Sequence, residues 1–77
     1  MSVQAINRAT EDIMGRHIRR GNLFIYQVMN TSDYIELDIQ YHGSSYRDSD
    51  LRDIINEAGR IASSYGVRMK WGVMQAL

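Results

Sequence analysis

The stretch Ser49–Val73, SDLRDIINEAGRIASSYGVRMKWGV, predicts one long amphipathic helix, a glycine stop and a strand. Its apolar residues recur at spacings of three and four, which is typical of a helix with one face in a core. Gly66 suits the left-handed conformation that commonly ends helices. The apolar residues beyond it then alternate, as in a half-buried strand: Val67, Met69, Trp71 and Val73.

Two strand-like runs precede this stretch, Asn22–Asn30 and Asp33–His42, with a turn-rich segment between them. The second run alternates cleanly between apolar and polar residues, whereas the first is apolar on both sides. A connecting loop of two or four residues keeps Gln27 out of the core. In this register one set of side chains in the first run faces the core, namely Phe24, Tyr26 and Val28. The other set faces away from it, namely Leu23, Ile25 and Met29.

The N-terminal segment from about Ser2 to Arg20 reads as a first helix, with Gly21 at its end. Gly15 lies inside this helix and costs about 1 kcal/mol relative to alanine, so the helix is the weaker of the two. Its final turn carries Arg16, Arg19 and Arg20.

These elements predict a single α+β domain over residues 1–77, in the order α-β-β-α-β. We expect two layers, with a three-stranded mixed sheet and both helices on one face. A crossover through the second helix makes strands two and three parallel. Because the first strand is apolar on both sides, it looks central, and the favoured spatial order is 2-1-3.

The composition excludes several kinds of chemistry. The chain has no cysteine, so disulfides, thiolate metal sites and thiol catalysis are not available. The two histidines, His17 and His42, are far apart in sequence, and we expect neither a metal nor another cofactor. No signal peptide and no apolar run of membrane-spanning length are visible, so the sequence predicts a cytoplasmic protein that does not bind membranes.

The sheet face away from the helices is the leading candidate for function. In the expected register, the residues that would form its apolar centre are Leu23, Ile25 and Met29. Those that would flank it are Tyr34, Glu36 and Asp38 on one strand, with Arg68 and Lys70 on another. Large exposed apolar patches tend to mark contacts, and border charges set their orientation. The alternative is that the stems of Arg68 and Lys70 simply cover the strip.

The leading hypothesis is therefore a small non-enzymatic protein-binding module, serving as an adaptor, an inhibitor or an accessory subunit. Its partner would be another protein, and a second copy of the chain is one candidate. The alternative is a nucleic-acid-binding module that uses Arg16, Arg19 and Arg20 at the end of the first helix. Against this, nine basic and nine acidic residues cancel, so the chain lacks a broad positive field.

Catalysis is the least favoured function. His42 lies near Ser44 and Ser45, but one histidine beside a serine is not a triad. No glycine-rich phosphate-binding motif is present. A hydrolase or transferase that uses His42 with a nearby carboxylate is the third hypothesis.

Overall fold

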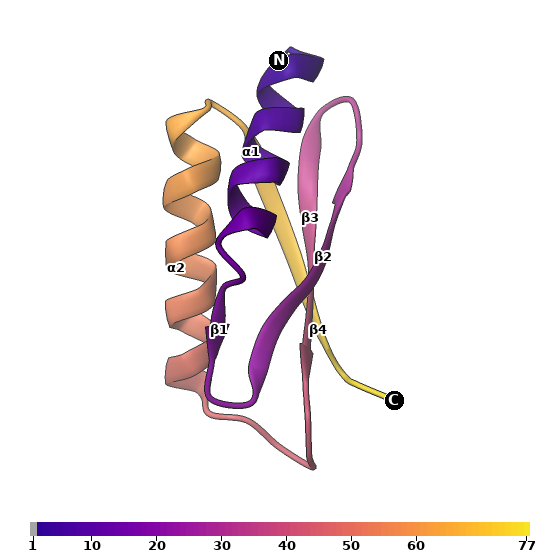
Figure 1. Ribbon diagram of the computed structural model, residues 1–77, viewed down its shortest axis with the longest axis vertical. Helices are drawn as coiled ribbons and strands as arrows, with labels where there is room; N and C mark the ends of the chain where they lie inside the picture. Colours follow the sequence, from indigo (N-terminus) through magenta and orange to yellow (C-terminus); the bar gives the residue numbers. More distant parts are fainter. Residues whose placement is uncertain (1) are drawn as a thin grey trace.

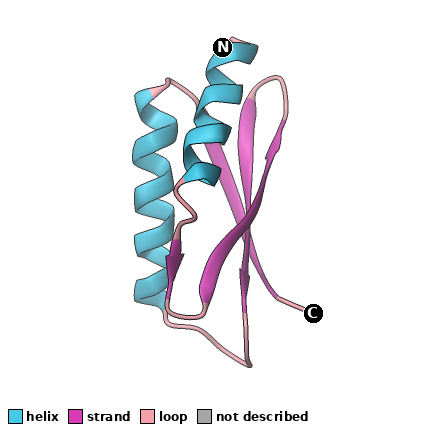
Figure 2. Cartoon of the chain, viewed as in Figure 1, coloured by secondary structure: helices cyan, strands magenta, loops and turns pink. Residues whose placement is uncertain are grey.

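The computed structural model describes residues 2–77, which form two helices and a single sheet. In chain order the elements are α1 (Val3–Gly15), β1 (Arg19–Arg20), β2 (Leu23–Asn30), β3 (Tyr34–Tyr41), α2 (Asp48–Ser64) and β4 (Arg68–Gln75). Both helices lie on the same side of the sheet, and the other side is left uncovered (Figure 1). Figure 2 shows the same two layers by type of secondary structure.

The sheet has four strands in the order β1-β2-β3-β4. Neighbours β1, β2 and β3 are antiparallel, and β4 pairs with β3 in parallel. The α+β class, the two helices and the parallel relation across α2 were predicted correctly. The three-stranded sheet and the order 2-1-3 were wrong. β1 adds a fourth strand, and the strand between β2 and β4 is β3, whereas the Asn22–Asn30 segment, which contains β2, was expected at the centre.

The first helix ends at Gly15, well before the expected Arg20. The Ser2 hydroxyl caps its start by accepting a hydrogen bond from the backbone N–H of Ala5 at 3.0 Å. Just beyond Gly15, His17 adopts a positive φ of 50°, and the next residue, Ile18, is buried in the core. The chain therefore turns inward, which converts the end of the expected helix into β1.

A β-bulge in β2 decides which side chains enter the core. Between the turn and the bulge, Val28 lies opposite Leu37 and faces the helices, as the sequence predicts. The ladder then shifts at Tyr26, so that Ile25 lies opposite Ile39. Two residues of β2 oppose one of β3 at such a bulge, and the alternation beyond it is reversed.

The reversal overturns half of the predicted facing pattern of β2. Leu23 is fully buried and Ile25 packs against the core, so neither lies on an exposed strip. Phe24 and Tyr26 face away from the helices, although both were expected in the core. β2 has apolar residues on both of its sides because the bulge reverses its alternation and because its outer face is apolar. This pattern therefore does not place β2 at the centre of the sheet.

The core lies between the helices and the inner face of the sheet. Its fully buried larger side chains come from both layers and are Ile6, Ile13, Leu23, Ile35, Leu37, Ile39 and Ile54. Burying each such side chain contributes about 1.5–3 kcal/mol. The alternation of β3 is the clearest in the chain, because Ile35, Leu37 and Ile39 are buried and the residues between them are only partly buried. β3 therefore lies between β2 and β4 and contributes side chains to both the core and the outer face of the sheet.

Candidate protein-binding face

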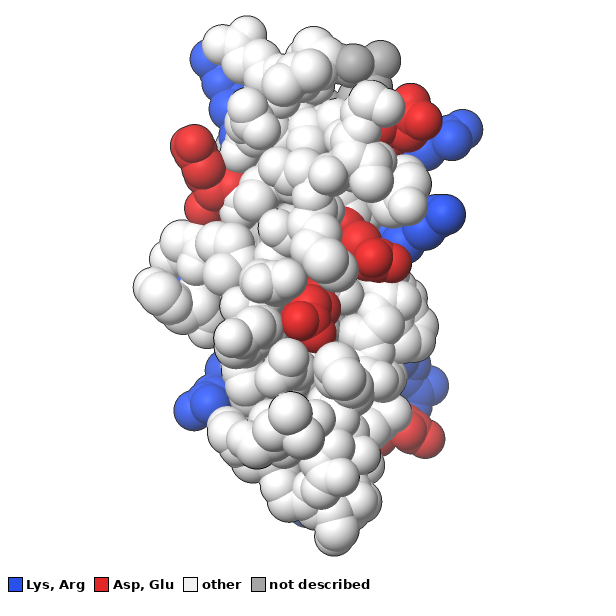
Figure 3. All heavy atoms as spheres, turned by 90° about the vertical axis from the view of Figure 1, so that its right-hand side faces the viewer, with Lys and Arg blue, Asp and Glu red and all other residues white. Residues whose placement is uncertain are grey.

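The uncovered side of the sheet carries the candidate site, and we call it the open face. Its side chains come from three strands: Phe24, Tyr26, Gln27 and Met29 from β2, Tyr34, Glu36, Asp38 and Gln40 from β3, and Arg68, Lys70, Gly72 and Met74 from β4. Figure 3 views the side of the molecule opposite the helices, where the surface is mostly uncharged, with acidic side chains near its middle and basic ones mainly at its margins. The open face is therefore largely uncharged, with a negative centre.

Large apolar side chains are exposed on this face. Tyr26 is 55% exposed, Met29 42% and Met74 56%. Phe24 and Tyr26 meet edge to face, with ring centroids 6.3 Å apart. The His42 ring also stacks on Phe24, with ring centroids 5.1 Å apart. Aromatic and methionine side chains are enriched where proteins meet, so this composition favours a contact surface.

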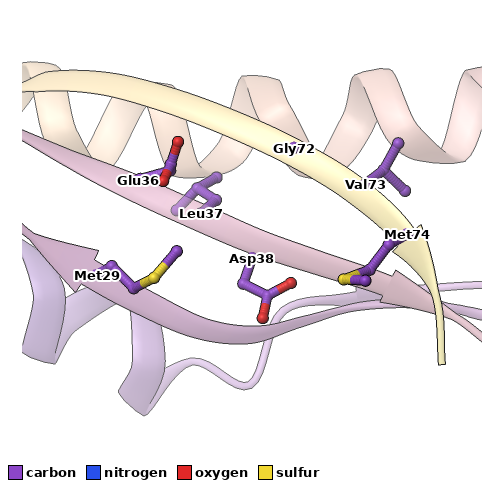
Figure 4. A pocket seen from close by; sticks show the side chains of 7 residues that line it. All are labelled: Met29, Glu36, Leu37, Asp38, Gly72, Val73 and Met74. Carbon is purple, nitrogen blue, oxygen red and sulfur yellow. The ribbon is translucent and has the colours of Figure 1, made fainter. Parts of the chain in front are cut away.

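A groove of about 300 Å³ crosses the open face over the middle of β3. Met29 of β2 and Met74 of β4 lie on either side of Asp38 (Figure 4). Gly72 of β4 lies opposite Asp38 in the register. Because Gly72 has no side chain, the carboxylate of Asp38 is left uncovered on the β4 side. Glu36 lines the same groove. The groove thus has apolar walls and a carboxylate floor, an arrangement that suits a cationic side chain with an aliphatic stem.

Arg68 and Lys70, the two basic residues predicted to border this face, both lie on it, and Lys70 contacts the neighbouring strand. Lys70 places its ammonium 4.4 Å from the centre of the Tyr34 ring, in a cation–π contact on β3. Gln40 donates to the Asp38 carboxylate at 3.3 Å, which holds that side chain at the groove. Lys70 therefore lies over the sheet, and the carboxylates of the groove stay open to a partner.

Six of the eight predicted contact residues come together on the open face: Met29, Tyr34, Glu36, Asp38, Arg68 and Lys70. Leu23 and Ile25 do not, because the bulge turns them into the core. Sequence reasoning placed Phe24 and Tyr26 on the wrong side and therefore missed them as surface residues. The only signal in the sequence for the facing of Phe24 and Tyr26 was that both neighbours of Ile25 are apolar. This pattern is compatible with either register, so it could not show which side chains face outward.

The arginines of the predicted basic cluster are not gathered at a helix end. Arg16 forms an ion pair with Asp12 at 2.9 Å, and Arg20 forms one with Glu57 of α2 at 2.9 Å. The guanidinium of Arg19 lies 5.4 Å from the centre of the Phe24 ring. Two of the three positive charges are thus already paired with carboxylates, and the premise of the nucleic-acid hypothesis, a basic final helical turn, is wrong.

Metal-binding clusters and membrane-spanning helices were also sought in the described part of the chain. Within residues 2–77, no three histidine, aspartate or glutamate side chains gather as a metal would require. No helix in that range has the length and apolar character needed to cross a membrane. Comparisons of the chain with protein-family models, curated proteins and solved structures gave no match.

Proposed function

We propose that this protein is a protein-binding module that docks through its open face. The observation that carries the proposal is the groove at Asp38. It has methionine walls and a carboxylate floor, and it lies on the face of the sheet that the helices leave uncovered. A sheet covered on one side only normally presents polar residues to water on the other. Here Tyr26, Met29 and Met74 are instead largely exposed together, and a contiguous patch of this kind marks a contact site.

The groove also defines the chemistry of the partner. A lysine or arginine stem can lie between Met29 and Met74, with its charge over Asp38 and Glu36. Charge-assisted hydrogen bonds to a carboxylate are stronger than neutral ones, and the apolar walls lower the local dielectric. The ring pair of Phe24 and Tyr26 beside the groove suits an apolar side chain of the same partner. The module therefore recognises a segment that combines a basic residue with an apolar one.

A random-peptide display library selected on the wild-type protein tests this proposal. We expect the enriched peptides to carry lysine or arginine next to an apolar residue, and to lose binding to an Asp38→Lys variant. Asp53→Lys on the exposed side of α2 is the matched control, since it changes the charge equally without touching the open face. Peptides that bind wild type and Asp38→Lys equally well would overturn the assignment of the groove.

A further inference from the structure

The outer edge of β4 is a second surface that the open face does not use. Along the whole of Arg68–Gln75, β4 pairs with β3 on one side, and among residues 2–77 no strand pairs with the other. The opposite edge of the sheet is only the two-residue β1. Long uncovered edges are templates for pairing with another chain, and proteins usually protect them with charges, proline or bulges.

The direction of the backbone groups along β4 follows from one hydrogen bond. The N–H of Ala76 donates to the carbonyl of Tyr41 at 2.9 Å, which continues the parallel ladder with β3. Because the backbone groups of a strand alternate in direction, every second residue before Ala76 also faces β3. The intervening residues direct their N–H and C=O groups out of the sheet: Met69, Trp71, Val73 and Gln75.

In the described residues 2–77, neither a charged side chain nor a proline protects the C-terminal part of this row of donors and acceptors. From Trp71 to Leu77 the sequence carries no charge, and the chain contains no proline. The one lysine of β4, Lys70, is directed over the Tyr34 ring and away from the edge. Trp71 stands on the helix side of the edge and is 44% exposed. The C-terminal half of β4 is therefore an edge without charged side chains.

Gly72, which also lines the groove at Asp38, lies in the middle of this edge. This residue has no positive φ, and a Cβ added to it would meet nothing within 4 Å. Neither backbone conformation nor packing within the chain calls for a glycine here, and glycine weakens a strand. A glycine in a strand often marks a site where another backbone approaches closely.

We infer that β4 pairs antiparallel with β4 of a second copy, with the two-fold axis at Gly72. This register places Trp71 opposite the partner's Val73 and pairs all four outward-directed residues, forming about eight hydrogen bonds. It sets Lys70 opposite the partner's Met74, whereas centring the pair on Lys70 would oppose two like charges. The two sheets become one, with all helices on the same side, and the groove at Asp38 stays open in each copy.

The mass of the protein in solution, measured by sedimentation equilibrium, tests this inference. We expect twice the chain mass of 8.9 kDa for the wild type and the single-chain mass for Trp71→Lys. Tyr26→Lys alters the open face only, so it should remain dimeric, and this separates the edge from the proposed peptide-binding site. A wild type that stays monomeric at about 1 mM, or a dimer broken by Tyr26→Lys and not by Trp71→Lys, overturns the inference.

A charge pair at one position tests the register. Met74→Glu would face the partner's Lys70, whereas Met74→Lys would repel it. We expect the dissociation constant of the dimer to fall about fivefold in the first variant and to rise about fivefold in the second. Equal effects of the two variants would exclude the register centred on Gly72.

Hydrogen exchange gives a readout that needs no variant. The backbone amides of Trp71 and Val73 face solvent in a single copy, so their exchange should slow as protein concentration rises. The amide of Gly72, which faces β3, serves as the internal reference. If the exchange of Trp71 and Val73 does not depend on concentration, the proposed pairing is absent.

Discussion

Tyr65, the residue that follows α2, donates its hydroxyl hydrogen to the carboxylate of Asp12 in α1 at 3.2 Å. Arg16 donates to the other oxygen of the same carboxylate at 2.9 Å. The Tyr65 contact joins the two helices, whereas the Arg16 contact lies within the α1 segment, where Arg16 is the C-cap. Hydrogen bonding by Arg16 is the main reason that the pKa of Asp12 lies below its ordinary value of 3.8. Desolvation, followed by the bond to Asp12, raises the pKa of Tyr65 above 10.0.

The lowered pKa of Asp12 makes stability depend on pH in the acid range. Folding favours the charged carboxylate, so its contribution is present above the unfolded pKa of about 3.8 and is lost as pH falls through the lower folded pKa. Asp12→Asn should therefore lower the free energy of unfolding at neutral pH, and the difference from wild type should vanish in strong acid. Urea titrations from pH 7 to pH 2 measure this, with Glu11→Gln as the control on the same helix. A constant difference at all pH values would contradict it.

The ion pair between Arg20 and Glu57 connects β1 to α2, with side-chain exposures of 39% and 27%. Because the pair is partly solvated, we expect a coupling free energy of only about 0.5–1 kcal/mol. A double-mutant cycle with Arg20→Gln and Glu57→Gln, followed by urea unfolding, measures it. Arg19→Gln removes a charge from the same strand without breaking this pair, so it should show no coupling to Glu57→Gln. Equal coupling in both cycles would mean that the contact is not specific.

The two sides of β2 should respond differently to truncation. Leu23 is fully buried, so Leu23→Ala should cost about 2–5 kcal/mol of unfolding free energy. Phe24 is only partly buried on the open face, and Phe24→Ala should cost less, although its ring is much the larger. Chemical denaturation of the two variants makes the comparison. The opposite ranking would show that the strand faces the other way.

Removing the bulge should be tolerated at one position and not at another. Deletion of Tyr26 leaves Ile25 opposite Ile39 and Gln27 opposite Asp38, so every other side chain of β2 keeps its side. Deletion of Val28 also shortens β2 by one residue, but it moves Gln27 into the buried position opposite Leu37. We expect the second deletion to cost at least about 2 kcal/mol more, for the lost valine and the buried amide. Thermal unfolding of both variants tests this, and equal losses would argue against the observed register.

Local signals accounted for most of the elements. The spacing of apolar residues in α2 and the alternation of β3 each depend on a single segment facing a single core, so the sequence alone predicts them. Gly66 ends the helical segment with a φ of 70°, as expected. The parallel relation of β3 and β4 also follows from the chain, since one helix joins the two strands.

Strand order, the bulge and the first helix end were decided by contacts between distant segments. β2 is apolar on both sides, so its pattern fits either facing, and only pairing with β3 chooses the one that places Leu23 and Ile25 on the core side. Ile18 is buried by packing in the core, which ends α1 early and adds β1. The sequence by itself determined the positions of α2, β2, β3 and β4 and the start of α1, because periodicity is local. Tertiary structure alone decided which apolar side chains face water, because that depends on a register set by the partner strand.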